Sequence, residues 1–549
     1  MRITYNDKLN KLLNPYLESL LKEKSSLEPE TLTLFDLFME DLDMGGRYGI
    51  FSEILEPRLE EIIREENIES IANLMDGRLN TLFRYMLGDE FAGLFHTYLQ
   101  LEARCPHTIG YDRRAQRSAH PSNHLDHARD AWLQFLKLRA TGFSVEAILK
   151  GGNTPEDTEE FSGYMNSSYW LAAQIAQGNE KVIEYLNQVL TSENNVHRLQ
   201  RWYLHAIAIS GHRPLLELEG KLLLAAKLQE GLRQAIVETM DEGCPESYLY
   251  LFSIIYNNGL QRFASVKRSI AVCTGIGEQD SSERITNKYV ELIWNFLNHP
   301  ETARNTLQSK DTVELYLALW SIGFYDTDEI RAIVPDIIRK GAKHQIQTLL
   351  YFLRCTQSSQ MNHLISKDAF EVWHDDPKVV AAILPLYMDG LYLSRYSDNK
   401  EAPTLSDYFE TPEEAVRHYG YLKQVYQSIS AKEIYSPYVF PWDCVVLTRS
   451  DVVLKMAYIA WMTNDIRLRE ELCTYLPALE SYNRASYIGI VLPRTESKVE
   501  QEYVLQSLGD RSADIRDEAY KVLSEMSLSP EQYQHCLLYT SPSPRDGLL

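Results

Sequence analysis

One loop holds the residues best suited to chemistry. They are one cysteine and four histidines, Cys105, His107, His120, His124 and His127. A helix that starts near Asn123 would place His124 and His127 on one face, three residues apart, where both rings reach the same metal ion. The spacing fits no established zinc signature, however, and the same side chains suit a solvated, positively charged loop. A metal site and a plain surface loop therefore both remain open.

Arginines surround this loop and raise a second possibility, the binding of phosphate or RNA. They are Arg104, Arg113, Arg114, Arg117 and Arg129. No series of aromatic residues is interleaved with them, as stacking on unpaired bases would favour. The chain also carries a formal net charge of −22, and a field of this sign repels nucleic acid and anionic lipid. We therefore expect these arginines to pair with acidic groups of the protein itself, and we predict neither a membrane nor a nucleic-acid partner.

The remaining motifs indicate turns and no catalysis. Gly275 and Gly277 have the spacing of a dinucleotide-binding loop but lack its third glycine and its preceding strand. The run Met44–Gly49 lacks the Gly-Lys-Ser/Thr of a phosphate loop. The chain has neither a GxSxG nor an HExxH motif, and the carboxylates of Asp375 and Asp376 diverge because the residues are neighbours. The sequence thus indicates no catalytic residues and no cofactor.

The composition is that of a folded, soluble protein from a reducing compartment. Of the 549 residues, 44% are hydrophobic and 24% charged, which is too apolar for disorder. This length exceeds what one core usually organises, so several domains or a repeat array are expected. The seven cysteines stand singly, without a CxxC pair. No secretory apolar segment follows Met1, and no apolar stretch is long enough to span a bilayer, so we predict a cytoplasmic protein.

Hydrophobic periodicity predicts helices along nearly the whole chain. One face shows the i, i+3, i+4, i+7 stripe in Ile346, Leu349, Leu350 and Leu353. Between Thr312 and Ile322 nearly every position is apolar, which predicts a helix covered on several sides. The best strand candidate is Val439–Leu447, and its Pro441 weakens the pattern.

Glycines separate the predicted helices. Each follows an apolar run, where a left-handed residue would end a helix: Gly142, Gly178, Gly211, Gly243, Gly259, Gly323, Gly341 and Gly390. Connections this short make neighbouring helices antiparallel, and a long series of such pairs forms a stack. The predicted fold is all-α, an α-solenoid of antiparallel helix pairs with a helical N-terminal region.

Two patterns favour helix pairs of the HEAT type. Pro335 and Pro385 each interrupt an apolar run and would kink the first helix of a pair. The segment Leu505–Met526 resembles a HEAT repeat, with Asp510 in the turn and Arg516 in the following helix, where such residues tie adjacent units together. A single match also fits an ordinary helical hairpin in a non-repeating domain.

Composition suggests three segments. Residues 1–150 form an N-terminal helical region, residues 151–535 the HEAT-like repeat region, and residues 536–549 a non-native tail. The pair Gly151 and Gly152, followed by polar residues and proline, marks the first boundary.

The tail has a composition unlike the rest of the chain. From Cys536 it reads CLLYTSPSPRDGLL and resembles translated sequencing-adapter read-through, which ends many unrelated reading frames. Ser529 and Pro530 would start a helix that the tail then cuts off. We therefore expect the natural protein to continue beyond this fragment.

The segment Tyr248–Gly277 resembles the N-terminal helical region of a large uncharacterised bacterial family. The resemblance centres on Asn257–Arg268, NNGLQRFASVKR, and extends more weakly to Arg339–Gln345 and Leu505–Met526. Members of that family usually carry a further domain of unknown function downstream, and some are labelled molybdate-metabolism-regulator-like. The resemblance covers roughly residues 180 to 535 and implies no established activity.

The sequence therefore favours a non-enzymatic helical-repeat scaffold that binds a protein partner or its own C-terminal domain. A metalloprotein or enzyme that uses the cluster from Cys105 to His127 is one alternative. A HEAT-like protein that binds nucleic acid along a basic concave face is the other.

Overall fold

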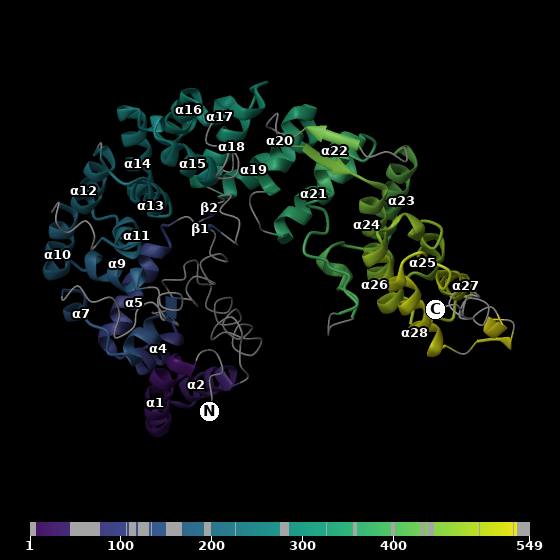
Figure 1. The fold of residues 1–549 in the computed structure, drawn as a ribbon, viewed down its shortest axis with the longest axis horizontal. Helices are drawn as coiled ribbons and strands as arrows, with labels where there is room; N and C mark the ends of the chain where they lie inside the picture. The colour runs from purple at the N-terminus through teal and green to yellow at the C-terminus, as the bar shows by residue number, and fades with distance from the viewer. Residues whose placement is uncertain are drawn as a thin grey trace, which may run out of the picture. The chain divides into compact units, whose positions relative to one another are not determined.

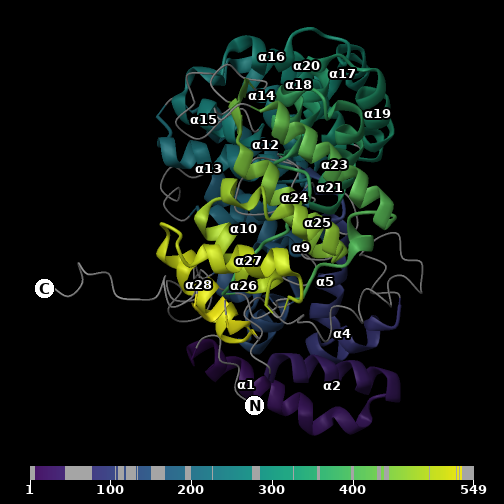
Figure 2. The ribbon, with the colours of Figure 1, turned by 90° about the vertical axis from the view of Figure 1, so that its right-hand side faces the viewer.

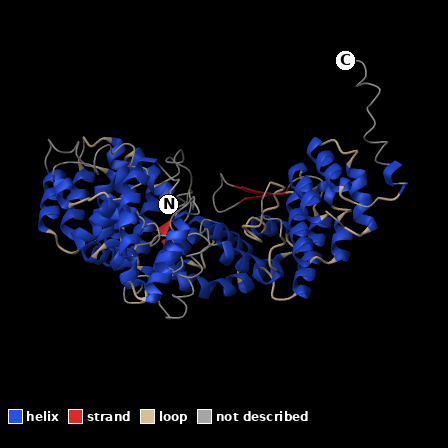
Figure 3. Cartoon of the chain, turned by 90° about the horizontal axis from the view of Figure 1, so that it is seen from below, coloured by secondary structure: helices blue, strands red, loops and turns tan. Residues whose placement is uncertain are grey.

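The described residues are almost entirely helical. The computed structural model describes residues 7–43, 77–105, 107–108, 117–118, 131–132, 134–149, 167–191, 199–225, 227–274, 285–325, 327–354, 359–396, 401–429, 434–437, 444–493, 495–526, 528–530 and 532–534. Strands occur among these residues only as two short hairpins (Figure 3). The predicted all-α class is confirmed, whereas the segment boundary at 150 and the tail lie outside the described residues.

The chain divides into two compact units, residues 1–308 with 317–330 and residues 309–316 with 331–549. The helices and strands of the first are α1 (Asp7–Glu23), α2 (Pro29–Asp43), α4 (Leu79–Leu87), α5 (Asp89–Glu102), β1 (His107–Thr108), β2 (Arg117–Ser118), α7 (Val145–Leu149), α9 (Ser168–Ala176), α10 (Glu180–Thr191), α11 (Arg201–Ser210), α12 (Arg213–Leu224), α13 (Glu230–Asp241), α14 (Pro245–Asn258), α15 (Ala264–Cys273), α16 (Asn287–Asn298) and α17 (Pro300–Thr306). Short 3₁₀ turns join some of them, at Lys24–Ser26 and Leu260–Arg262.

Helices of the first unit pack on the helix two places further along the chain. The helices α9, α11, α13 and α15 contact one another in this order, and so do α10, α12, α14 and α16 (Figure 1). The result is two layers, and short turns join α9 to α10, α11 to α12 and α13 to α14. Gly211 ends α11 with a φ of 67°, a left-handed conformation that lets the chain reverse into α12.

The turn after α13 shows how closely neighbouring helices of one layer approach. Cys244 N donates to the carbonyl of Ala208 in α11 at 3.1 Å. A Cβ on Gly243 would lie 2.6 Å from that same oxygen. Gly243 is therefore required for close packing and not for a left-handed backbone.

The predicted glycine stops are confirmed in part. Left-handed backbone occurs at Gly142, Gly178, Gly211, Gly259 and Gly390. Gly341 and Gly243 also follow helices, but neither has a left-handed backbone. The prediction for Gly323 is wrong, because the apolar run continues past it and Gly323 lies inside a helix.

The remaining elements run from α18 to α28. They are α18 (Thr312–Tyr325), α19 (Thr327–Lys340), α20 (Lys343–Arg354), α21 (Ser359–Trp373), α22 (Pro377–Ile383), α23 (Pro412–Ser428), β3 (Ile434–Pro437), β4 (Cys444–Leu447), α24 (Arg449–Thr463), α25 (Ile466–Leu472), α26 (Ser481–Val491), α27 (Lys498–Ser507) and α28 (Ala513–Ser524). The division between the units falls within α18 and α19. Short 3₁₀ turns occur at Leu405–Asp407 and Leu476–Ala478.

In the second unit, α24 packs on α26, α26 on α28, and α25 on α27, and Figure 2 shows these helices in green and yellow. The antiparallel hairpin β3–β4 pairs Ile434 with Leu447 and packs on α22. The end of the predicted strand, Cys444–Leu447, forms β4, and its residues 439–443 lie outside the described residues. None of the described helices combines the length and the apolar character that crossing a bilayer requires.

The two predicted proline kinks differ. Pro335 lies inside α19. Pro385 lies beyond the end of α22 at Ile383, so the prediction of a kinked helix there is wrong. A proline two residues after a helix end cannot continue it, and at this position it acts as a stop.

The HEAT-like segment Leu505–Met526 comprises the end of α27, the turn that follows and α28. Asp510 accepts from Ser512 N at 2.8 Å and pairs with Arg484 of α26, so it ties the turn to an earlier helix. Arg516 instead donates to the Asp510 and Arg511 carbonyls within the same turn. Only the aspartate makes the predicted link.

A buried arginine joins α12 to α13. Arg233 is fully buried and donates to the carbonyls of Leu223 and Ala225 at 2.7 and 3.1 Å. Its guanidinium lies 3.7 Å from the centre of the Phe263 ring. Arg233 therefore supplies donors to carbonyls at the end of α12 that have no partner in the helix.

Replacing this arginine should destabilise the first unit. We expect Arg233→Met, which keeps the volume but removes the donors, to lower the free energy of unfolding by about 2–4 kcal/mol. Urea unfolding measures the difference. The control is Arg213→Met, at an exposed arginine of α12 that pairs with Glu217, where a change below about 1 kcal/mol is expected. Equal losses for both variants would contradict this role for Arg233.

Candidate functional site

The structure places only part of the predicted Cys–His loop. Cys105 is buried just after α5, and its thiol donates to the Leu101 carbonyl at 3.4 Å. Burial raises the pKa of this thiol well above its usual value, with Cys244 and Glu102 adding to the effect, so the metal-binding thiolate is disfavoured. His107 lies in β1. The other three residues, His120, His124 and His127, lie outside the described residues, and the metal site stays a prediction.

The expectation that the loop arginines pair with acidic groups is confirmed for one of them. Arg104 forms an ion pair with Glu246 of α14. Arg117 lies in β2. Arg113, Arg114 and Arg129 lie outside the described residues.

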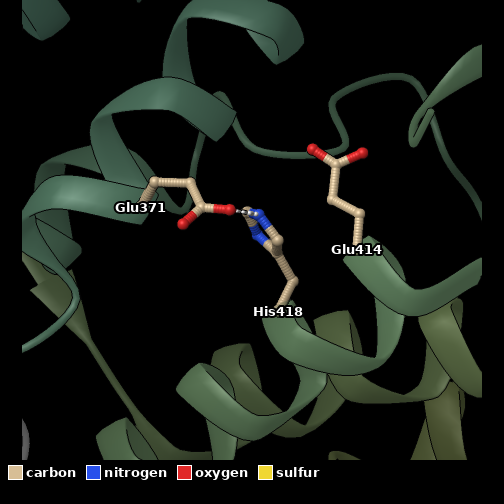
Figure 4. Close-up of side chains that lie close together, drawn as sticks. All are labelled: Glu371, Glu414 and His418. Atoms are coloured by element: carbon tan, nitrogen blue, oxygen red, sulfur yellow. Dashed lines mark hydrogen bonds and ion pairs between the residues drawn. The ribbon is translucent and has the colours of Figure 1, made fainter. Parts of the chain in front are cut away.

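A different set of potential ligands comes together in the second unit. Glu371 of α21 meets Glu414 and His418 of α23 (Figure 4), with one ligand atom from each within 4.8 Å of the others. Glu414 and His418 are four residues apart and therefore share a helical face. The start of α23 is fixed by Thr411, whose hydroxyl accepts from Glu414 N at 3.2 Å, and by Pro412 in the first turn.

His418 is the centre of a hydrogen-bonded chain. Its ring is fully buried, with Nε2 3.1 Å from Glu371 Oε1 and Nδ1 2.8 Å from the Tyr387 hydroxyl. Because a carboxylate only accepts, Nε2 carries the proton and Nδ1 accepts from Tyr387. Burial lowers the pKa of His418 more than the Glu371 carboxylate raises it, so the ring is neutral.

Both carboxylates are already paired with cations. Glu371 accepts from Arg417 Nη2 at 2.7 Å and from the Tyr421 hydroxyl at 3.2 Å. Glu414 accepts from Lys367 Nζ at 2.8 Å and from Glu410 N at 2.7 Å. Burial alone would raise the pKa of each carboxyl, but these hydrogen bonds bring it below the usual value.

The chemistry of the cluster follows from this balance. Two glutamates and an imidazole are suitable zinc ligands, but a divalent ion would have to displace Lys367 and Arg417. As a general base, His418 has no exposed ring atom that a substrate could reach. With two negative charges, two positive charges and a neutral ring, the cluster is best suited to joining α21 to α23.

A second buried histidine lies beside this cluster. His363 of α21 accepts from Met388 N through Nδ1 at 2.9 Å and donates through Nε2 to the Tyr408 carbonyl at 2.8 Å. Met388 has a φ of 52°, in the left-handed region that a side chain disfavours. His363 thus holds the strained turn after α22 against the segment before α23.

Sequence patterns alone did not single out these residues. Only the four-residue spacing of Glu414 and His418 was available, and that spacing is common on exposed helices. Glu371 is 47 positions from His418, and Tyr387 is 31. Their meeting depends on how the helices pack.

A family model described as a family of unknown function, DUF5724, matches residues 34–537. Comparison with curated proteins and with solved structures gave no match. The family match agrees with the predicted resemblance to an uncharacterised family. The molybdate-regulator label and the read-through tail stay predictions.

Neutralising Glu371 tests its role as the anchor between α21 and α23. We expect Glu371→Gln to lower the free energy of unfolding by about 1–3 kcal/mol, because Arg417 and the His418 N–H lose a charged acceptor. Denaturant unfolding followed by circular dichroism measures this. The matched control is Glu413→Gln, an exposed residue in the first turn of α23, which should change little. Unchanged stability in Glu371→Gln would show that the cluster does not support the fold.

The buried position of His363 leads us to predict that the stability of the protein depends on pH. Burial lowers its pKa to about 4, against about 6.5 in an unfolded chain. The unfolded chain therefore takes up the proton first, so this contribution is complete above about pH 6.5 and is lost as the pH falls toward 4. Between pH 7 and pH 5 we expect a loss of about 2 kcal/mol from this residue.

Unfolding in urea at the two pH values measures the slope, and His363→Gln provides the comparison. Glutamine can accept from Met388 and donate to Tyr408 but does not titrate in this range. The variant should retain only the smaller slope of the other groups, including His418, whose pKa is also lowered. The same slope in both proteins would rule out His363 as its source.

Proposed function

The chain belongs to DUF5724, a family of unknown function, and we propose that it is a cytoplasmic, non-enzymatic helical-repeat scaffold that binds a protein partner. The observation that carries the proposal is the packing of each helix from α9 to α14 on the next but one. This packing supports the proposal of an α-solenoid of antiparallel, HEAT-like pairs, because in such a stack each repeat contacts its neighbours. Such stacks present extended surfaces, and their usual role is binding.

Charge defines the kind of partner. The net charge of −22 favours a partner with a basic surface and disfavours nucleic acid. The polar cluster around His418 does not favour a catalytic role over this proposal, because its charged groups are paired with one another. It supplies no free group for catalysis.

One segment of the second unit has the character of a contact surface. We call residues 391–396 the tyrosine strap. Tyr392 and Tyr396 are 66% and 73% exposed. Exposed tyrosines with few rotatable bonds are common at the energetic centres of protein interfaces.

The backbone of the tyrosine strap is held in place by other helices. The Leu391 carbonyl accepts from the Tyr458 hydroxyl at 2.9 Å, and Arg395 N donates to Ser486 Oγ at 3.3 Å. The Arg395 guanidinium also pairs with Asp514 at 2.6 Å. The rings are therefore presented on a fixed segment, which reduces the entropy lost on binding.

Partner binding tests the proposal. Proteins that co-purify with the tagged chain are identified, produced separately and titrated against it. We expect one saturable complex whose affinity falls at least ten-fold from about 0.05 M to about 0.5 M salt, since its charges attract. Replacing both strap tyrosines, Tyr392→Ser with Tyr396→Ser, should weaken it at least ten-fold.

The matched control is Tyr520→Ser, at a tyrosine of α28 that is 60% exposed and outside the strap. It should leave the affinity unchanged. If the affinity for the partner changes neither with salt nor on replacement of the strap tyrosines, the proposed surface is wrong. Failure of every co-purified protein to bind in purified form would overturn the scaffold role itself.

A further inference from the structure

The first unit contains a concave pocket far along the chain from the polar cluster. Its volume is about 610 Å³, within the range of about 300–1,000 Å³ that small-molecule sites occupy. It forms where α5, α7 and α10 begin, next to α9, and these helices lie together in Figure 1. Most of the lining residues lie in helices, and the segment 142–144 and Asn179 add the turns between them.

The floor of the pocket is aromatic. Phe91, Phe143 and Trp170 line it and are all nearly fully buried. The ring centres of Phe143 and Trp170 are 5.0 Å apart in an edge-to-face arrangement. Rings fixed in this way give a rigid apolar surface, which suits a flat or branched hydrocarbon group.

The rim carries charges of both signs. Glu90, Glu146 and Glu180 supply carboxylates, and Arg139 and Lys181 supply cations. Within the part of the chain that the structure describes, the side chains of Glu90, Glu180, Arg139 and Lys181 form no ion pair. The Arg139 guanidinium lies 5.8 Å from the centre of the Phe91 ring, so a positive charge borders the aromatic floor directly.

This combination restricts the ligand. A purely anionic ligand would bring its charge against the rim carboxylates, and a purely cationic one against a guanidinium and an ammonium. A molecule that carries both charges can pair with both sets of rim charges. An apolar group on the same molecule would cover the aromatic floor and exclude water from it.

We propose that this pocket binds a small zwitterion with an apolar side chain, of the α-amino-acid class. The ligand carboxylate pairs with Arg139 and Lys181, its ammonium group with Glu90 and Glu180, and its side chain lies against Phe143 and Trp170. This inference goes beyond the scaffold role and does not depend on it. A scaffold with such a pocket would report the supply of a metabolite to its partner.

The test uses the full chain and four matched probes in titration calorimetry. L-Phenylalanine carries both charges, phenethylamine only the positive charge, 3-phenylpropanoate only the negative charge, and N-acetylphenylalaninamide neither. We expect L-phenylalanine to bind at least ten-fold more tightly than each of the others, because only it pairs with both sets of rim charges.

Variants of the rim locate the binding. Arg139→Gln and Glu90→Gln should each weaken L-phenylalanine at least ten-fold while leaving the weak binding of the neutral probe unchanged. Glu184→Gln, at an exposed glutamate of α10 outside the pocket, is the control and should have no effect. Circular dichroism confirms that each variant is folded.

Three results would overturn the inference. One is the absence of saturable L-phenylalanine binding up to about 10 mM, beyond the weakest useful affinity. Another is equal affinity for phenethylamine or 3-phenylpropanoate, which would indicate a site for a single charge. The third is equal binding by the rim variants and the control, which would place the ligand elsewhere.

Discussion

An isolated amphipathic helix cannot shield its own apolar stripe, and this constraint orders both units of the protein. In the first unit the stripe of α11 is met by α9 on one side and α13 on the other, and the same relation holds for α10, α12 and α14. Residues such as Leu204 and Ile207 are then completely buried. The turns must be short and close enough to permit this packing, which explains why Gly243 has no room for a side chain.

Three polar features of this interior, Arg233, His363 and the cluster around His418, have matched hydrogen bonds or charges, whereas the buried Glu219 carboxyl has no hydrogen-bond partner among the described residues and burial raises its pKa. Arg233 satisfies carbonyls at the end of a helix, and His363 is held neutral between a backbone donor and a backbone acceptor. In the cluster around His418, every carboxylate has a cation beside it. The reason is common to all three cases, since an unpaired polar group in a dry interior costs more free energy than a single good contact returns.

The charged groups of the interior cluster are paired with one another. Groups at the surface are therefore the ones that can bind other molecules. The interior cluster has suitable ligand types, but its charges are already used. The charged residues of the pocket near α5, α7 and α10 lie at the ends of helices. Water solvates them there at little cost until a ligand replaces it. The tyrosine strap is likewise an irregular segment fixed by regular helices. Binding groups on loops that a rigid scaffold positions are a common arrangement in proteins.

Local patterns in the sequence determined which segments are helical. The stripe from Ile346 to Leu353 and the apolar run from Thr312 to Ile322 are helices as expected, because a helical face repeats every three to four residues. Local patterns failed at one glycine and one proline, because either residue can lie within a helix or mark its end. Gly323 was predicted to end a helix but lies inside α18, and Pro385 was predicted to kink a helix but lies beyond α22.

The family match, which extends over residues 34–537, is also a property of the sequence alone. Only the tertiary structure decided which side chains meet. Glu371, Tyr387 and His418 come from three different segments, and Phe91, Phe143 and Trp170 from three others. Contacts of this kind depend on the angles and spacings between packed helices, which many distant residues set together and which no short stretch of sequence records.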